Sequence, residues 1–157
     1  MSWQNIRSKL RNLWVPEVSN LVDIHIARYR KSGVWDDLGR VSFVYNNEEI
    51  FVIADSENWK YCVETFNAYR LHVNQIPEIR AESIKSGAID VSLFYELINY
   101  YINSFNILDV FTANNLLYQI FGILDRRIGK RTLKKNLDFI ESNEVLLKFY
   151  KIRMQIA

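Results

Sequence analysis

The sequence predicts an α+β domain in which an N-terminal helix and a small antiparallel sheet of three to four strands pack with a C-terminal set of helices. In the stretch 21–29, apolar residues alternate with polar ones, as a half-buried strand requires, and the stretches 40–45 and 49–54 are two further β-rich runs. After Asp90, apolar residues recur every three or four positions, as in amphipathic helices. No repeat, low-complexity tract or linker interrupts the chain of 157 residues. We therefore expect a single domain over residues 1–157, with a helix, the sheet and a second helix in 1–77 and only helices in 78–157.

The N-terminal helix is predicted from apolar residues at spacings of three and four, followed by the helix breaker Pro16. Its apolar stripe consists of Trp3, Ile6, Leu10 and Leu13.

The first strand follows from the alternation of Val22, Ile24 and Ile26 with Asp23 and His25. Two further β-rich runs are joined by Asn46-Asn47-Glu48. Because Asn tolerates the left-handed conformation of a tight turn, this junction predicts a hairpin and hence an antiparallel meander.

Cap residues indicate where the helices begin. Ser56 is the expected cap of a helix that runs through Val73, and residues 78–88 are expected to form a short helix or loop that leads to Gly87. Farther along the chain, the expected helix starts are Asp90, Thr112, Thr132 and Asn143.

Composition excludes several classes of protein. The net charge is only +2, so nucleic-acid binding by the whole surface is not expected. Cys62 is the only cysteine, which excludes an intrachain disulfide and a multi-cysteine zinc site. No apolar run reaches the length of a membrane span, and the N-terminus lacks the apolar core of a signal peptide. We expect a cytoplasmic protein.

The most informative segment is residues 126–135, here called the basic block. Six of its ten residues are Lys or Arg and none is acidic. The first three cations are expected in the last turn of a helix, where the helix dipole favours them, with Gly129 as the left-handed residue behind them. The last two are expected in the next helix, where Asp138 and Glu141 can offset them. The six cations are Arg126, Arg127, Lys130, Arg131, Lys134 and Lys135.

Three interpretations of the basic block stay open: a solvated helix corner, a surface for an anionic protein partner, and a site for nucleic acid or phosphate that also uses Arg28 and Arg30. Asp125 is interpreted as structural, because a carboxylate beside arginines can hold another segment by bidentate pairing. The segment 129–132 is not a phosphate loop, since Leu124 stands where the first glycine belongs and a helix precedes it.

No catalytic residue, metal ligand or cofactor is predicted. His25 and His72 are the only histidines, and neither has a carboxylate at a ligand-like spacing. Cys62 falls in an apolar stripe, which is typical of an inert thiol.

Two motifs carry a resemblance to a family. They are Ser-Trp-x-x-Ile-Arg-x-x-Leu at residues 2–10 and Leu-Asp-Arg-Arg-x-Gly-Lys-Arg-Thr-Leu at residues 124–133. With the later segment 149–153, the chain resembles, over nearly its whole length, an uncharacterised family of small bacterial cytosolic proteins. The resemblance implies a bacterial source and a stand-alone domain, and it supplies no catalytic residues. The chain departs from the family pattern at residues 31–38, which contain Trp35.

These observations lead to three functional hypotheses. The first is a non-enzymatic protein-interaction module, such as an immunity-like or antitoxin-like protein or an adaptor, whose contact surface combines the basic block with nearby exposed aromatic residues. The second is a nucleic-acid or phosphate-ligand binding protein. The third is an enzyme of unrecognised type.

Overall fold

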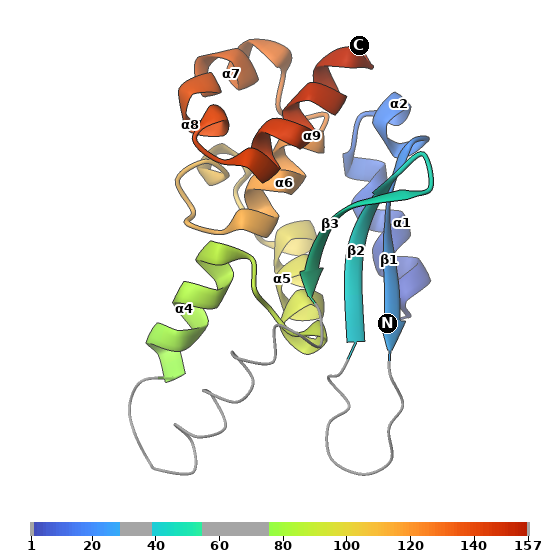
Figure 1. The fold of residues 1–157 in the computed structure, drawn as a ribbon, viewed down its shortest axis with the longest axis vertical. Helices are drawn as coiled ribbons and strands as arrows, with labels where there is room; N and C mark the ends of the chain where they lie inside the picture. Colours follow the sequence, from blue (N-terminus) through green and yellow to red (C-terminus); the bar gives the residue numbers. More distant parts are fainter. Residues whose placement is uncertain (1, 29–38, 55–75, 157) are drawn as a thin grey trace.

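A computed structural model describes residues 2–28, 39–54 and 76–156 (Figure 1). These residues form α-helices and one antiparallel sheet with the strand order β1-β2-β3. The strands are β1 (Val22–Arg28), β2 (Gly39–Tyr45) and β3 (Glu48–Ala54). The predicted α+β class and the three-stranded meander are confirmed. The helix predicted from Ser56 to Val73 lies outside the described residues, as do Arg30, Trp35, Cys62 and His72.

The hairpin between β2 and β3 forms at the predicted junction. Asn46 and Asn47 have positive φ values of 51° and 67°, as a two-residue turn of type I′ requires. β1 pairs with β2 from Val22 opposite Tyr45 to Arg28 opposite Gly39. Val22 and Ile24 of β1 are buried whereas His25 is exposed, as the alternation of apolar and polar residues predicts.

The N-terminal helix α1 (Trp3–Leu13) begins at the cap residue Ser2. It ends three residues before Pro16, because Trp14 already has an extended backbone (φ −76°, ψ 160°). Pro16 instead begins the short helix α2 (Pro16–Ser19), at a position where its missing N–H is not needed.

The C-terminal part consists of helices joined by short connections. Asp90 and Asn143 cap helices as predicted. Two predicted starts are wrong: Asn115 rather than Thr112 caps α6, and Thr132 lies inside α7. The elements are α4 (Ile76–Ser86), α5 (Val91–Asn103), the 3-10 helix η2 (Ile107–Asp109), α6 (Leu116–Leu124), α7 (Lys130–Lys135), α8 (Leu137–Glu141) and α9 (Glu144–Gln155).

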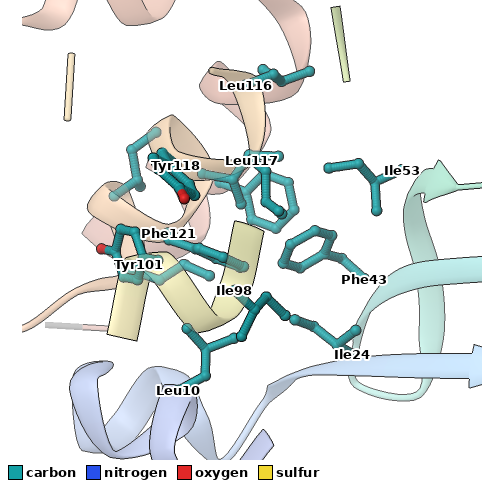
Figure 2. Close-up of a cluster of buried hydrophobic side chains, with 14 of the residues drawn as sticks. Leu10, Ile24, Phe43, Ile53, Ile98, Tyr101, Leu116, Leu117, Tyr118 and Phe121 are labelled. Atoms are coloured by element: carbon teal, nitrogen blue, oxygen red, sulfur yellow. The ribbon is translucent and has the colours of Figure 1, made fainter. Parts of the chain in front are cut away.

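Helix α6 lies at the centre of the core, and each of its nine residues is buried. Its aromatic residue Phe121 contacts Phe43 of β2, with ring centroids 6.1 Å apart. Phe43 also contacts Phe149 of α9, at 5.1 Å. Figure 2 shows Phe43, Ile24 and Ile53 from the sheet facing Phe121 and Leu117. The sheet and the C-terminal helices therefore share one hydrophobic core, and the end of α6 is held firmly inside it.

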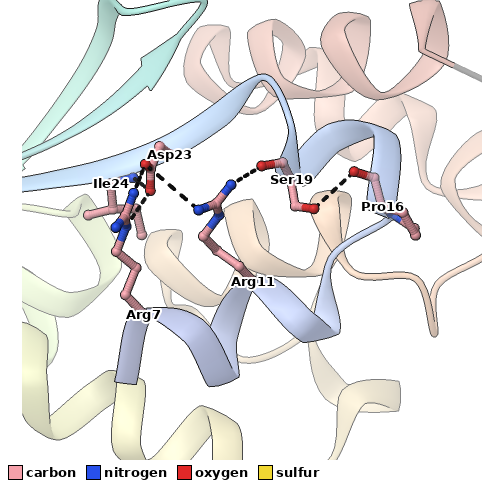
Figure 3. A network of polar contacts seen from close by, with 6 residues as sticks. All are labelled: Arg7, Arg11, Pro16, Ser19, Asp23 and Ile24. Carbon is pink, nitrogen blue, oxygen red and sulfur yellow. Dashed lines mark hydrogen bonds and ion pairs between the residues drawn. The ribbon is translucent and has the colours of Figure 1, made fainter. Parts of the chain in front are cut away.

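A polar network ties α1 to β1 and α2 (Figure 3). Nε of Arg7 donates to Oδ1 of Asp23 at 2.8 Å, and Nη2 of Arg7 donates to Oδ2. Arg11 donates to the carbonyl of Ser19. Burial of Asp23 acts to raise its pKa, but the hydrogen bonds from Arg7 and Ile24 and the positive charges of Arg11 and Arg7 outweigh burial and lower the pKa. Arg7 of the N-terminal motif and the neighbouring Arg11 of α1 are thus engaged within the fold.

Within the described ranges, no helix combines the length and the apolar character that crossing a membrane requires.

Close packing at Gly122 yields a first prediction. A Cβ atom added there would lie 2.4 Å from Cγ2 of Val110, which is 1% exposed. We expect Gly122→Ala to lower the free energy of unfolding by about 1–3 kcal/mol, because the overpacking outweighs the gain of at most about 1 kcal/mol in helix propensity. Denaturant titration measures this change.

The matched control is Gly129→Ala. Gly129 has a φ of −76° and no atom within 4 Å of an added Cβ. We expect its stability to change by less than about 1 kcal/mol. Equal losses in the two variants would contradict the packing described for α6.

Candidate functional site

Asp125 terminates α6 and joins it to the connection between α1 and α2. Its backbone is extended (φ −72°, ψ 130°) and pairs antiparallel with Trp14. The N–H of Val15 donates to the carbonyl of Leu124 at 2.9 Å, and the N–H of Arg126 donates to the carbonyl of Leu13 at 2.8 Å. These two hydrogen bonds place the residues after Leu124 in a short ladder instead of a further helical turn.

The carboxylate of Asp125 is fully buried and accepts hydrogen bonds from two side chains. The hydroxyl of Tyr101 in α5 donates to Oδ2 at 2.9 Å. Arg127 binds both carboxylate oxygens: its Nε donates to Oδ1 at 3.0 Å and its Nη2 donates to Oδ2 at 2.7 Å. The backbone N–H of Arg127 also donates to Oδ1, at 2.9 Å. This bidentate geometry is the strongest form of an Arg–carboxylate pair.

The electrostatics of this group keep Tyr101 and Arg127 protonated, as their hydrogen bonds to Asp125 require. Burial, together with the charge and the hydrogen bond of Asp125, raises the pKa of Tyr101 far above its usual value, so the phenol remains a donor. The hydrogen bond to Asp125 raises the pKa of Arg127 despite partial burial. The guanidinium carbon of Arg127 also lies 5.9 Å from the centroid of the Tyr101 ring.

A second arginine binds the same turn through backbone carbonyls. Arg153 of α9 is 7% exposed; its Nε donates to the carbonyl of Ile123 at 3.2 Å and its Nη2 to the carbonyl of Ile128 at 3.1 Å. Burial lowers the pKa of Arg153, against the negative charges of Glu17 and Asp125. We call Tyr101, Asp125, Arg127 and Arg153 the clasp. Sequence reasoning did not assign Arg153 to this group; its only signal was the segment 149–153 that supports the family resemblance.

The structure corrects two predictions about the start of the basic block. Arg126 and Arg127 do not lie in the last turn of a helix, because α6 ends at Leu124. Lys130 begins α7, and Gly129 is the N-cap of that helix with an extended backbone (φ −76°, ψ 158°) rather than a left-handed C-terminal residue. Lys130 and Arg131 therefore face the positive end of the α7 dipole, which disfavours them.

Five of the six cations in the basic block lie outside the clasp. Their side chains form no hydrogen bond or ion pair with any residue in the described ranges. The side chain of Arg127, by contrast, is engaged by Asp125. Four of the five are exposed and Lys130 is half-buried. We call this set the free cations: Arg126, Lys130, Arg131, Lys134 and Lys135.

The acidic residues expected to offset the end of the basic block are exposed as well. Asn136 (φ −102°, ψ 15°) lies between α7 and α8 and interrupts the helix there. Neither Asp138 nor Glu141 of α8 forms an ion pair with Lys134 or Lys135 in the described structure. The helical spacing that predicted these ion pairs does not continue across the break.

Arg28, one of the two residues proposed to extend the basic surface, does not lie beside it. Arg28 ends β1, and Figure 1 shows this end of the sheet far from α7, which lies at the opposite end of the molecule. Arg30 lies outside the described residues.

The residues considered for catalysis or metal binding are not brought together in the described part of the chain. His25 is exposed on β1, and His72 lies outside the described ranges. Among residues 2–28, 39–54 and 76–156, no group of three or more His, Cys, Asp or Glu side chains is placed to hold a metal ion.

The sequence model of the SF0329 protein family matches residues 2–154, which include α1, the sheet, the clasp and the basic block. The chain belongs to this family. A search of curated proteins and a search of solved structures each found no match. The match to the SF0329 protein family therefore covers nearly the whole described fold.

The adjacent residues Arg126 and Arg127 provide a direct test of the clasp. We expect Arg127→Gln to lower the free energy of unfolding by about 1.5–3 kcal/mol, because the buried carboxylate loses its charged hydrogen-bond donor. Arg126→Gln removes the same charge from a free side chain and keeps the backbone hydrogen bond to Leu13. We expect its effect to stay within about 0.5 kcal/mol. Denaturant unfolding at neutral pH compares the two, and equal losses would contradict the assignment of Arg127 to the clasp.

Proposed function

We propose that this protein is a non-enzymatic protein-interaction module that binds an anionic protein partner through the free cations. The observation that supports the proposal is that five cations, with no acidic residue between them in the sequence, have no partner in the described fold. Arg126 follows Asp125 directly and precedes Arg127, whose side chain is hydrogen-bonded to Asp125, and the N–H of Arg126 itself donates to the carbonyl of Leu13. A backbone that is already held by hydrogen bonds favours binding, because little conformational freedom is lost when the partner binds.

The arrangement of α7 is unfavourable for the isolated chain. Lys130 and Lys134, and Arg131 and Lys135, are like charges at a spacing of four residues in a six-residue helix. Lys130 and Arg131 also oppose the helix dipole. Local features that conflict with stability without a compensating contact are expected at functional sites. Carboxylates of a partner would relieve both conflicts.

Nucleic acid is a weaker candidate than a protein partner. A nucleic-acid footprint generally needs a wide basic face, whereas these cations occupy one corner of a chain whose net charge is +2. Arg28 does not widen that corner, since it ends β1 at the far end of the sheet.

The biological setting is also part of the proposal. We propose a bacterial source and a cytoplasmic location, in line with the resemblance of the chain to a family of small bacterial cytosolic proteins. In that setting, we propose an immunity-like or antitoxin-like protein, which neutralises another protein by binding it, or an adaptor; neither form of the hypothesis needs catalytic residues.

Charge reversal of three free cations tests the proposal. The variant Arg126→Glu, Arg131→Glu, Lys134→Glu leaves Arg127 and the clasp intact. Used as bait in a bacterial lysate, it should capture at least about tenfold less of the partner than the unchanged protein does, because repulsion replaces attraction across the interface. Quantitative mass spectrometry measures the captured proteins, with and without nuclease.

The matched control reverses three exposed lysines outside the block, Lys9, Lys85 and Lys151, and so makes the same change in net charge. It should capture the partner as well as the unchanged protein does. Thermal unfolding checks that both variants remain folded. Equal capture by both variants would refute the proposed surface, and loss of all capture after nuclease treatment would favour nucleic acid instead.

A further inference from the structure

Large apolar side chains are exposed on η2 and on α8, the helix that follows α7 in the chain. Leu108 of η2 is 82% exposed and Phe139 of α8 is 40% exposed. The half-buried ring of Phe111 lies against Phe139, with ring centroids 6.1 Å apart in an edge-on arrangement. We call Leu108, Phe111 and Phe139 the apolar edge. An exposed apolar side chain on its own is ordinary, whereas several together beside a charged surface are typical of a contact site.

The apolar edge adjoins the basic block through α8. Phe139 follows Lys135 by four residues, and only Asn136 separates α7 from α8. Asn136 holds the two short helices together: its side chain donates to the carbonyl of Thr132 at 2.9 Å, and its carbonyl accepts from the N–H of Ile140 at 3.0 Å. A partner that reaches Lys134 and Lys135 therefore also comes close to Phe139.

We infer that the partner presents an acidic segment that also carries a large apolar side chain, with its carboxylates on the free cations and its apolar group on Leu108 and Phe139. This inference rests on the proposed function and names the chemistry of the partner. Charge complementarity selects acidic groups for α7, and burial of the apolar edge adds a contribution that salt does not screen.

An anionic membrane surface fits the same corner less well. Asp109, Asp138 and Glu141 are exposed on the two elements that carry Leu108 and Phe139. A lipid surface of uniform negative charge would meet these carboxylates together with the cations. A protein segment can place its carboxylates opposite the free cations and keep them away from Asp109, Asp138 and Glu141.

Two synthetic peptides test the inference by fluorescence anisotropy. The first peptide intersperses Glu with Leu and Phe; the second has Ser at every Leu and Phe. The unchanged protein should bind the first peptide roughly tenfold more tightly, as burial of about one large apolar side chain implies. The variant Leu108→Ser, Phe139→Ser should lose this difference, and the variant Arg131→Glu, Lys134→Glu should lose binding of both peptides.

The control variant Tyr100→Ser removes a 56% exposed aromatic side chain from α5, outside the apolar edge, and should bind like the unchanged protein. Equal affinity for the two peptides, or no binding of either, would overturn the inference. So would binding of the unchanged protein to anionic vesicles that depends on Leu108 and Phe139, or self-association that depends on them.

Partner capture by the charge-reversal variant is measured separately. If capture depends on the free cations while the two peptides bind equally, this inference fails and the proposed function stands; if capture does not depend on them, the proposed function fails.

Discussion

The fold around the basic block depends on one buried carboxylate. Asp125 is fully buried, and a carboxylate in that position is stable only when donors surround it. Its donors are the phenol of Tyr101 on α5 and the guanidinium and backbone N–H of Arg127. The backbone on either side of Asp125 pairs with the chain around Trp14. One residue thereby joins the N-terminal segment, α5 and the end of α6.

This constraint determines how the charges of the basic block are used. Because the chain leaves α6 in an extended conformation at Asp125, Arg127 turns back onto the carboxylate while its neighbour Arg126 points to solvent. Arg153 closes the same turn through two backbone carbonyls. Of the seven cations near this turn, two hold the fold together and five remain outside it. The motif is therefore both a structural element and an exposed surface.

Much of the fold follows from local chemistry that the sequence displays. The hairpin was predictable because Asn46 and Asn47 are residues that adopt positive φ, and the starts of α5 and α9 were predictable because Asp90 and Asn143 are good caps. The start of α6 was misplaced because Thr112 and Asn115 are both acceptable caps, and packing decides between them. The role assigned to Gly129 failed because the pairing of Asp125 with Trp14, 111 residues apart in the sequence, ends α6 early.

The sequence predicted Asp125 and the cations of the basic block as parts of the candidate site, but not which of these cations bind within the fold and which stay free. Sequence alone identified Asp125 as a structural partner for arginines and the block as a concentration of positive charge. Which arginine would bind the carboxylate depends on the direction of the backbone after Leu124, and the position of Arg153 depends on how α9 packs against α6. The ion pairs expected from Asp138 and Glu141 assumed a continuous helix, and Asn136 interrupts it.

The division of the arginines into structural and free side chains can be measured directly from the exchange of their Nε–H protons with water, by NMR spectroscopy of the unchanged protein. In Arg127 and Arg153 this proton is in a hydrogen bond, to the carboxylate of Asp125 and to the carbonyl of Ile123 respectively. We expect exchange at these two positions to be slower by about an order of magnitude or more than at Arg126 and Arg131. Comparable protection at Arg126 or Arg131 would show that the block is consumed by the fold, and would contradict the account of a surface left open for a partner.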